Sequence, residues 1–311
     1  MIVVTGAAGF IGSNLVHGLN ALGRSDILVV DDLTRGEQHL NLNALSFVDV
    51  IDRADLFEAL PGLKTIDAIF HQGACSDTTE SDGRYMMKNN YEYSKRLLQV
   101  AEERRAKFLY ASSAAVYGDG KSGFREDPAC ENPLNVYGFS KMVFDQHVRQ
   151  RLGSARCQIV GLRYFNVYGP QERHKGRMAS VAMHLYDQLA AAGEMSLFEG
   201  SSGFLRDFIH VDDTVAVNLF FFGNTTSGLY NCGTGRARSF VDIATRLREL
   251  HGGGVVREIP FPADLAGKYQ RFTEADLTDL RRAGYDRPFL ELEDGVARYY
   301  EVLRATRGYL R

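Results

Sequence analysis

The chain has 311 residues, of which 45% are hydrophobic and 24% are charged, a composition typical of soluble globular proteins and unlike that of disordered ones. Its 36 lysines and arginines nearly balance 39 aspartates and glutamates, so the net charge of −3 argues against a dedicated nucleic-acid binder. No apolar stretch approaches the ~18 residues that a membrane span requires, so we expect no contact with a membrane.

The cysteine spacing indicates the cellular compartment. Cys75, Cys130, Cys157 and Cys232 lie too far apart for a CxxC metal site or a small disulfide framework. Because strand-like residues begin at Ile2, we expect no secretory signal peptide. We therefore expect a cytoplasmic protein with reduced thiols and no bound metal.

Short apolar runs alternate with longer helical patterns over the first half of the chain. We expect strands over residues 2–4, 27–30, 45–50, 66–71, 107–112 and 158–163. We expect helices between them, over residues 10–22, 53–60, 84–104 and 135–152. Continuous apolar strands that alternate with helices are typical of a parallel sheet covered on both faces. The sequence therefore predicts an α/β fold with a Rossmann-like, doubly wound parallel sheet.

The rhythm of the sequence changes after Gly169-Pro170. A helix is expected over 178–192, short strands near 196–198 and 207–211, and further helices in the tail. We place the boundary near residue 170. Residues 1–170 would form a dinucleotide-binding Rossmann domain and residues 171–311 a smaller α/β substrate-binding lobe, although 214–222 could pack back on the sheet.

A glycine-rich turn follows the first strand and opens a helix. Gly6 can make the tight turn, Gly9 lets the backbone approach a pyrophosphate, and Gly12 allows close packing of helix and strand. The exposed N–H groups and the helix dipole favour phosphate there. Asp31 ends the second strand, 19 residues after Gly12, at the distance expected of a carboxylate that meets the adenosine ribose. This pattern predicts a dinucleotide site.

The identity of the dinucleotide depends on charges near its ribose. Asp31 and Asp32 favour NAD, because a carboxylate repels the 2′-phosphate of NADP. Arg35 and Arg53 could offset this repulsion if they fold over the ribose edge. On these residues alone both cofactors remain open.

A Tyr-x-x-x-Lys pair carries the predicted chemistry. Tyr137 and Lys141 are four residues apart, which places both side chains on one face of the expected helix. A phenol with a pKa of ~10 is a poor base, and a neighbouring ammonium favours its phenolate. Ser112 and Ser113 end the preceding strand, where a serine hydroxyl can bond the same substrate oxygen.

These features together resemble the extended, nucleotide-sugar-modifying branch of the short-chain dehydrogenase/reductase superfamily. The resemblance covers most of the chain in order, through residues 6–12 (GAAGFIG), 110–118 (YASSAAVYG), 137–141 (YGFSK), 163–170 (RYFNVYGP) and 206–213 (RDFIHVDD). Dehydratases of this branch commonly carry an Asp-Glu pair after the catalytic Ser or Thr, where this chain has Ala114 and Ala115. A redox-neutral epimerase is therefore favoured over a dehydratase.

A closer resemblance is to the family of ADP-glyceromanno-heptose 6-epimerases. It is nearly full length and rests on residues 71–76 (HQGACS), 85–91 (YMMKNNY), 169–180 (GPQERHKGRMAS), 197–201 (LFEGS) and 268–273 (KYQRFT). It implies reversible inversion at C6″ of the heptose in ADP-D-glycero-D-manno-heptose, by transient oxidation and re-reduction with tightly bound NADP, for lipopolysaccharide core biosynthesis. It also implies a homo-oligomer, a pentamer in this family.

The resemblance assigns roles residue by residue. Tyr137 and Lys175 would be the two proton-transfer groups, assisted by Ser113 and Lys141. The cofactor would be held by Lys141 with Gly6, Gly9, Phe10, Ile11, Gly12, Asp31, Asp32, Arg53, Gln72, Gly73, Ala74, Cys75, Ser76, Asn89 and Val167. The substrate would be held by Asn166, Arg177, His184, Phe198, Glu199, Gly200, Ser201, Arg206 and Tyr269.

Two positions depart from that family. Gln38 stands where relatives often carry a lysine near the cofactor phosphate, which weakens the prediction of NADP, and Arg177 stands where a serine is common. Without context, the charged run from Arg173 to Arg177 would be a solvated loop. Its place after the last strand of the expected sheet, where a cleft between the lobes is expected, favours a ligand site instead.

Two alternatives stay open. A UDP-hexose 4-epimerase or a related nucleotide-sugar reductase would share this fold and these motifs. A non-catalytic dinucleotide sensor is a more remote alternative, because sensors often lose the Tyr/Lys pair that is present here.

Overall fold

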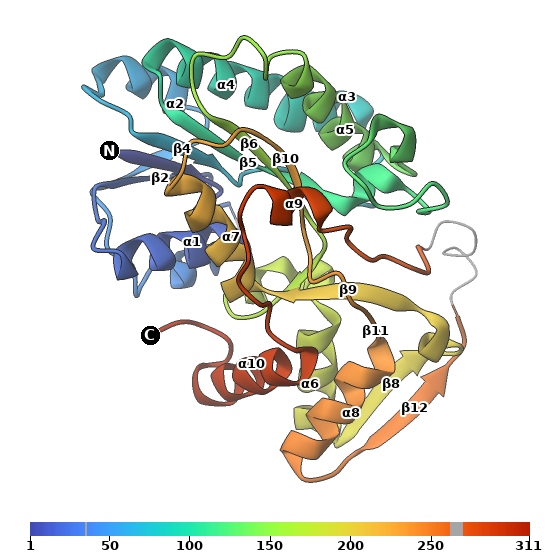
Figure 1. The fold of residues 1–311 in the computed structure, drawn as a ribbon. Helices are drawn as coiled ribbons and strands as arrows, with labels where there is room; N and C mark the ends of the chain where they lie inside the picture. Colours follow the sequence, from blue (N-terminus) through green and yellow to red (C-terminus); the bar gives the residue numbers. More distant parts are fainter. Residues whose placement is uncertain (35, 262–269) are drawn as a thin grey trace.

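The computed structural model describes residues 1–34, 36–261 and 270–311. A seven-stranded parallel sheet runs through the molecule in the order β10-β6-β5-β4-β1-β2-β3 (Figure 1). Its strands are β1 (Ile2–Thr5), β2 (Ile27–Asp31), β3 (Asp49–Asp52), β4 (Ala68–His71), β5 (Lys107–Ser113), β6 (Ile159–Tyr164) and β10 (Gly228–Cys232). The predicted Rossmann-like α/β fold is confirmed.

Helices cover both faces of this sheet. One face carries α3 (Gly83–Met86), α4 (Tyr93–Arg104) and α5 (Val136–Arg149), and the other carries α1 (Phe10–Ala21) and α7 (Val211–Phe222) (Figure 1). Side chains of a strand point alternately to the two faces. Ile2 and Val4 accordingly join the core beneath α1 and α7, whereas Val3 joins the core beneath α4 and α5.

The third strand lies later than predicted. It spans Asp49–Asp52 and pairs with β2, instead of covering 45–50. Leu45 and Phe47 pack against the core below the sheet, and this burial produced the apolar signal. The strand itself is at the edge of the sheet and largely exposed, so its residues carry little hydrophobic pattern.

Two predicted helices differ in form from the expectation. The helix expected over 53–60 shrinks to α2 (Leu56–Ala59) and a short 3-10 turn, Leu60–Gly62. The helix expected over 84–104 is continuous, but between α3 and α4 it contains a π-helical turn, Met87–Glu92. Such turns often mark functional sites. Here it aims Asn90 at the loop after β4, where Asn90 bonds both the N–H and the C=O of Cys75.

The remaining elements form a smaller α/β lobe. It contains α6 (Val181–Ala192), α8 (Phe240–His251), α10 (Leu292–Thr306), the parallel pair β8 (Glu194–Phe198) and β12 (Val255–Ile259), and the sheet β11 (Ala237–Ser239), β9 (Leu205–His210) and β7 (Asn166–Tyr168). This lobe has a hydrophobic core of its own.

The chain returns to the main sheet after residue 170. Helix α7 packs on α1, β10 pairs with β6, and the short α9 (Thr278–Arg282) lies on β10. Division of the chain near residue 170 stays a prediction. Within the described ranges, no helix is both long and apolar enough to span a bilayer.

Candidate active site

A cavity of about 800 Å³ opens at the carboxyl ends of the parallel strands. Its walls come from the ends of β1, β2, β4, β5 and β6 and, from the smaller lobe, from Arg206, Phe208, Phe240 and the segment 174–182. Ligands of open α/β sheets bind at such an edge. All residues predicted to hold the cofactor, and all four predicted catalytic residues, line this one cavity.

The geometry of the glycine turn leaves no room for side chains. Gly6 has a φ of +66°, and a Cβ atom there would lie 2.6 Å from the Gly73 backbone. A Cβ on Gly12 would lie 2.1 Å from the Gly6 carbonyl oxygen. The predicted tight turn and close helix–strand packing are therefore both seen. Helix α1 begins immediately afterwards, with no side chain capping its N-terminus among the described residues.

The carboxylates at the end of β2 already have hydrogen-bond or ion-pair partners. The Asp31 oxygens accept from the backbone N–H of Ala8 and of Asp32, each at 2.9 Å, so this side chain braces the glycine turn. Burial raises the pKa of Asp31, and these two bonds oppose the shift. Asp32 Oδ2 lies 3.0 Å from Arg53 Nε, and Arg53 also donates to Asn89 Oδ1 at 2.9 Å. Arg35 lies outside the described residues.

The loop after β4 contains a buried polar side chain that lines the cavity. Gln72 Oε1 accepts from Tyr164 Oη at 3.0 Å, but its buried Nε2 has no partner among the described residues. Gln72 lines the cavity, as do Gly73, Ala74, Cys75 and Ser76. A buried donor on a residue that lines the cavity beside a glycine turn fits a bound dinucleotide, which would supply an acceptor.

Helix α5 carries the Tyr/Lys pair into the cavity. Asn135 caps this helix by accepting from the Gly138 N–H at 2.8 Å. Lys141 Nζ donates to the Ala111 carbonyl oxygen at 2.8 Å, and the side chain is almost fully buried. Burial lowers the pKa of Lys141 to about 8, against the opposing charge of Asp145.

Tyr137 lies on the same helix, in a buried environment beside Ser113. Burial raises the pKa of Tyr137, and a hydrogen bond with the Ser113 side chain opposes the shift. The Lys141 ammonium, which was expected to favour the phenolate, donates to the Ala111 carbonyl oxygen. Ser113 Oγ also accepts from the Ala115 N–H at 3.1 Å, so its hydroxyl hydrogen can point elsewhere.

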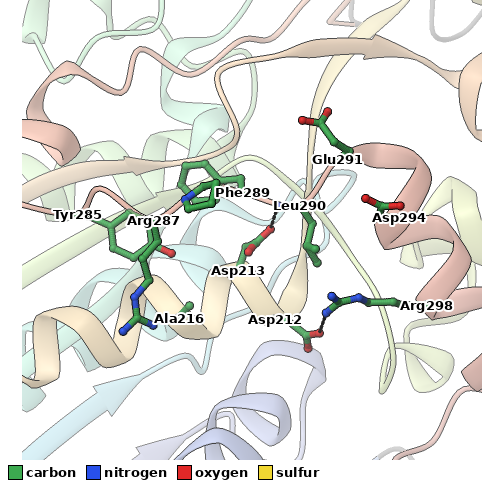
Figure 2. Close-up of a pocket in the computed structure, with 11 residues that line it drawn as sticks. Asp212, Asp213, Ala216, Tyr285, Arg287, Phe289, Leu290, Glu291, Asp294 and Arg298 are labelled. Atoms are coloured by element: carbon green, nitrogen blue, oxygen red, sulfur yellow. Dashed lines mark hydrogen bonds and ion pairs between the residues drawn. The ribbon is translucent and has the colours of Figure 1, made fainter.

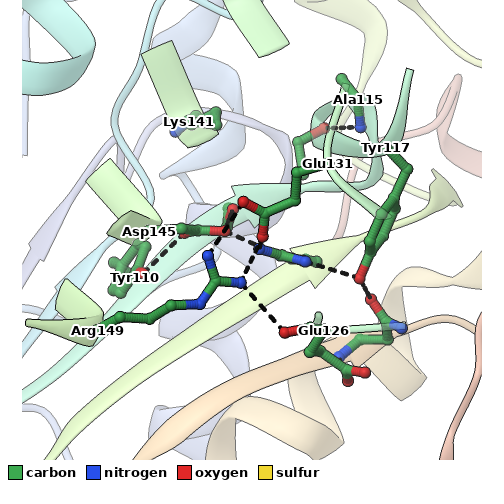
Figure 3. Close-up of polar contacts among 12 residues, drawn as sticks. Tyr110, Ala115, Tyr117, Glu126, Glu131, Lys141, Asp145 and Arg149 are labelled. Carbon is green, nitrogen blue, oxygen red and sulfur yellow. Dashed lines mark hydrogen bonds and ion pairs between the residues drawn. The ribbon is translucent and has the colours of Figure 1, made fainter. Parts of the chain in front are cut away.

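A buried charge network supports α5 and β5 from behind, and sequence reasoning missed it (Figure 3). Asp145, one helical turn after Lys141, accepts from Tyr110 Oη at 2.8 Å, Ser112 Oγ at 2.9 Å and Arg163 Nε at 2.8 Å. Arg163 also pairs with Glu131. The available signal was an arginine inside an otherwise apolar strand, since such a charge is almost never fully buried without partners.

Lys175 enters the cavity from a different element than Tyr137. It belongs to the 3-10 segment Arg173–Met178, and its Nζ lies 4.9 Å from the centre of the Phe10 ring. Glu172 Oε2 is 3.9 Å from the same Nζ. Burial lowers the pKa of Lys175, and the charge of Glu172 opposes the shift. The charged loop is thus part of the cavity wall.

The predicted substrate residues divide into two groups. Asn166, Arg177 and Arg206 line the cavity, and Arg177 Nη2 reaches across to Asp77 Oδ2 at 3.0 Å and Thr79 Oγ1 at 2.6 Å. The cavity does not include His184, Phe198, Glu199, Gly200 and Ser201, and Tyr269 lies outside the described residues. Sequence reasoning missed the apolar wall formed by Val181, Phe208, Phe240 and Ile243.

A second cavity, of about 430 Å³, lies where the start of α7 meets the start of α10 (Figure 2). Four carboxylates and two arginines surround it, and Arg298 reaches Asp212 at 3.7 Å. None of the residues of the glycine turn or of the Tyr/Lys pair lines it. The cavity at the strand ends is therefore the candidate active site.

Comparison with known proteins agrees with this geometry. The model of the NAD dependent epimerase/dehydratase family matches residues 2–233. ADP-L-glycero-D-manno-heptose-6-epimerase of Brachyspira hyodysenteriae is 55% identical over 100% of both chains.

Solved structures agree as well. The ADP-L-glycero-D-manno-heptose-6-epimerase of Helicobacter pylori superposes with a TM-score of 0.88 at 34% identity, over 98% of this chain and 96% of that one. UDP-glucose 4-epimerase of Thermotoga maritima, solved with UDP-glucose, superposes with a TM-score of 0.83 at 26% identity, over 98% and 99%. The resemblance drawn from the sequence motifs, and with it the prediction of an epimerase, is confirmed. The chain belongs to the NAD dependent epimerase/dehydratase family.

Proposed function

We propose that this chain is an ADP-L-glycero-D-manno-heptose-6-epimerase, which inverts C6″ of the heptose in ADP-D-glycero-D-manno-heptose. One observation carries the proposal: Tyr137, Lys141 and Lys175 line the same cavity as the glycine turn. The 55% identity over the whole chain to a relative of that name supports the choice of substrate.

Two proton-transfer groups suit an inversion. A nicotinamide cofactor, when bound, would accept hydride from the sugar carbon and return it. Tyr137 would take the hydroxyl proton, with Ser113 bonding the same oxygen. Lys175 would protonate the carbonyl oxygen when the sugar presents its other face. These two groups come from α5 and from the segment after β7, so each can serve a different orientation of the sugar.

The cavity residues also bear on the choice of cofactor, and we propose NADP. Each Asp31 oxygen already accepts a hydrogen bond, one from the Ala8 N–H of the glycine turn and one from the Asp32 N–H, which weakens the repulsion of a 2′-phosphate. Arg53 is held beside Asp32 at the cavity and offers a guanidinium to that phosphate. Mass analysis of nucleotide released from the purified protein tests this, and NAD alone would contradict it.

The arginines that line the cavity on the side of the smaller lobe suit the binding of a nucleoside diphosphate sugar. Arg206 and Arg177 line the wall that the smaller lobe contributes, and Asn166 adds an amide. Arginine is well adapted to bind phosphate oxygens in pairs. We therefore propose that these residues, rather than those of the segment 198–201, make the first contacts with the substrate.

The decisive experiment follows a panel of sugar nucleotides by proton NMR. We expect ADP-D-glycero-D-manno-heptose to be converted to its L-glycero epimer without net change in the cofactor. Turnover of UDP-galactose or UDP-glucose in its place would identify a hexose 4-epimerase, the activity named for the Thermotoga maritima structure.

Variants test the roles of the two proton-transfer groups. Tyr137→Phe and Lys175→Met should each lose ~10²–10⁴-fold in epimerisation rate while still binding cofactor, because each removes one positioned acid or base. Dismutation of an analogue with an aldehyde at C6″ should suffer less in either variant, since one competent group suffices there. Epimerisation by Lys175→Met at the unmodified rate would contradict the two-base mechanism.

We further propose a cytoplasmic homo-oligomer, a pentamer as the family resemblance implies. Light scattering of the purified chain at micromolar concentration tests the assembly. A stable monomer would contradict it.

A further inference from the structure

Glu172 is a buried carboxylate beside the proposed second proton-transfer group. Its side chain is fully buried, and its Oε2 lies 3.9 Å from Lys175 Nζ. Ser180 holds the carboxylate through its N–H at 2.6 Å and its hydroxyl at 2.5 Å. The Gly169 N–H adds a third, longer contact at 3.5 Å. The carboxylate is therefore fixed by groups other than Lys175.

The separation between the two charges has a chemical consequence. At 3.9 Å the ammonium and the carboxylate attract each other but are too far apart for a hydrogen bond. The protons of Lys175 are therefore not committed to Glu172. Lys175 faces the Phe10 ring, and neither its ring contact nor its ion pair prevents it from donating into the cavity.

Other ionisable groups nearby do not substitute for this pair. The phenol of Tyr299, on α10, faces Glu172, but burial and the charge of Glu172 raise its pKa well above the usual range, so it stays neutral. Arg173 pairs with Asp187 at 2.5 Å. His174 lies 3.1 Å from the Asn41 amide, on the side of the glycine turn.

We propose that Glu172 is a positioning residue for Lys175, whose charge keeps that lysine protonated and its ammonium at the cavity wall, ready to protonate one face of the transient carbonyl. The inference rests on the proposed function for its catalytic consequence. A lysine drawn out of water loses its proton easily unless a negative charge accompanies it. The opposed effects of burial and Glu172 on the pKa of Lys175 agree with this role.

The charge of Glu172 can be separated from its shape. Glu172→Gln keeps an acceptor for Ser180 but removes the negative charge. In the holoenzyme, the rate of epimerisation should then fall at a lower pH than in the unmodified enzyme, by about one pH unit or more, because Lys175 deprotonates earlier. At alkaline pH this shift corresponds to an epimerisation rate about tenfold below that of the unmodified enzyme, while the rates of the two enzymes at acidic pH stay close to each other.

Matched variants distinguish positioning from support of the fold. Ser180→Ala removes a hydrogen bond to Glu172 and the cap of α6 but leaves both charges. The alkaline limb of its pH–rate profile, the pH range over which the epimerisation rate falls, should therefore not move even if its melting temperature falls. Glu172→Asp should return the limb toward its normal position. If Glu172→Gln does not fold, Glu172→Ala replaces it. An unmoved limb in the charge-removing variant, or an equal shift in Ser180→Ala, overturns the proposal.

A second readout does not depend on turnover. NMR of protein labelled at the lysine ε-carbons gives the pKa of Lys175 directly, with its signal identified by its loss in Lys175→Arg. A lower pKa in Glu172→Gln supports the coupling even if ADP-heptose proves not to be the substrate, in which case only the proposed function fails. An unchanged pKa overturns the coupling whatever the substrate is.

Discussion

Removing the guanidinium of Arg163 should destabilise the whole protein. This side chain is fully buried, and so is Asp145, whose Oδ2 lies 2.8 Å from Arg163 Nε. Glu131 also contacts Arg163 and is 2% exposed, but it keeps a second partner in Arg149. Among the described residues, Asp145 would keep the hydrogen bonds from the hydroxyls of Tyr110 and Ser112 and the more distant charge of Lys141.

The expected magnitude follows from that uncompensated charge. Breaking a buried ion pair by removing one partner costs about 3–5 kcal/mol. An unfolding entropy of about 2.1 cal/mol/K per residue, taken over 311 residues, corresponds to a loss of about 1.5 °C in melting temperature per kcal/mol. Arg163→Met, which keeps most of the side-chain volume, should therefore melt about 5–8 °C below the unmodified protein.

Thermal unfolding followed by circular dichroism measures this difference. Arg282→Met is the matched control, because Arg282 is 73% exposed and its pair with Asp279 lies at the surface. An exposed pair contributes about 1 kcal/mol or less, so that variant should melt within a few degrees of the unmodified protein.

A double variant tests the cause. Combining Arg163→Met with Asp145→Leu removes both charges, and the loss should be smaller than the sum of the two single losses because no unpaired charge remains. The reasoning is refuted if Arg163→Met and Arg282→Met have the same melting temperature, or if the stability losses of the two single variants simply add in the double variant.

Three further predictions concern the cavity. Gly6→Ala should abolish retention of the nucleotide, measured by release on denaturation, because its Cβ would lie 2.6 Å from the Gly73 backbone; Gly23→Ala, also at positive φ but with no atom within 4 Å, should retain it. Arg53→Met should weaken binding of NADP about 10–100-fold and of NAD little, by calorimetry, since a charged hydrogen bond contributes about 1.5–3 kcal/mol; equal losses would argue against contact with the 2′-phosphate. Burial lowers the pKa of His71 to about 3, so between about pH 6.5 and pH 3 only the unfolded chain takes up this proton. The free energy of unfolding should therefore fall by up to ~1.4 kcal/mol for each pH unit in this range. His71→Gln should reduce this pH dependence, measured by urea unfolding, and an unchanged pH dependence would assign it to other groups.

The sequence by itself determined the parts of the site that depend on neighbouring residues. Gly6 and Gly12 were interpretable because a tight turn between a strand and a helix imposes its backbone geometry on consecutive residues. Tyr137 and Lys141 were interpretable because a helix brings residues four apart to one face. The alternation of buried strands with helices likewise predicted the parallel sheet, because the spacing of apolar residues within each element indicates whether it is a strand or a helix.

Only the tertiary structure decided which distant charges meet. Asp145 lies on α5 and its partner Arg163 on β6. Glu172 faces Tyr299, which belongs to α10. The partners are far apart in the sequence, so no local pattern links either pair. The same holds for Phe198, which does not line the cavity. Its ring lies 5.6 Å from that of Phe261, centre to centre, and packs against the core of the smaller lobe. Whether such a side chain is buried, paired or open to a ligand depends on what the folded chain places opposite it, and a one-dimensional pattern does not contain that information.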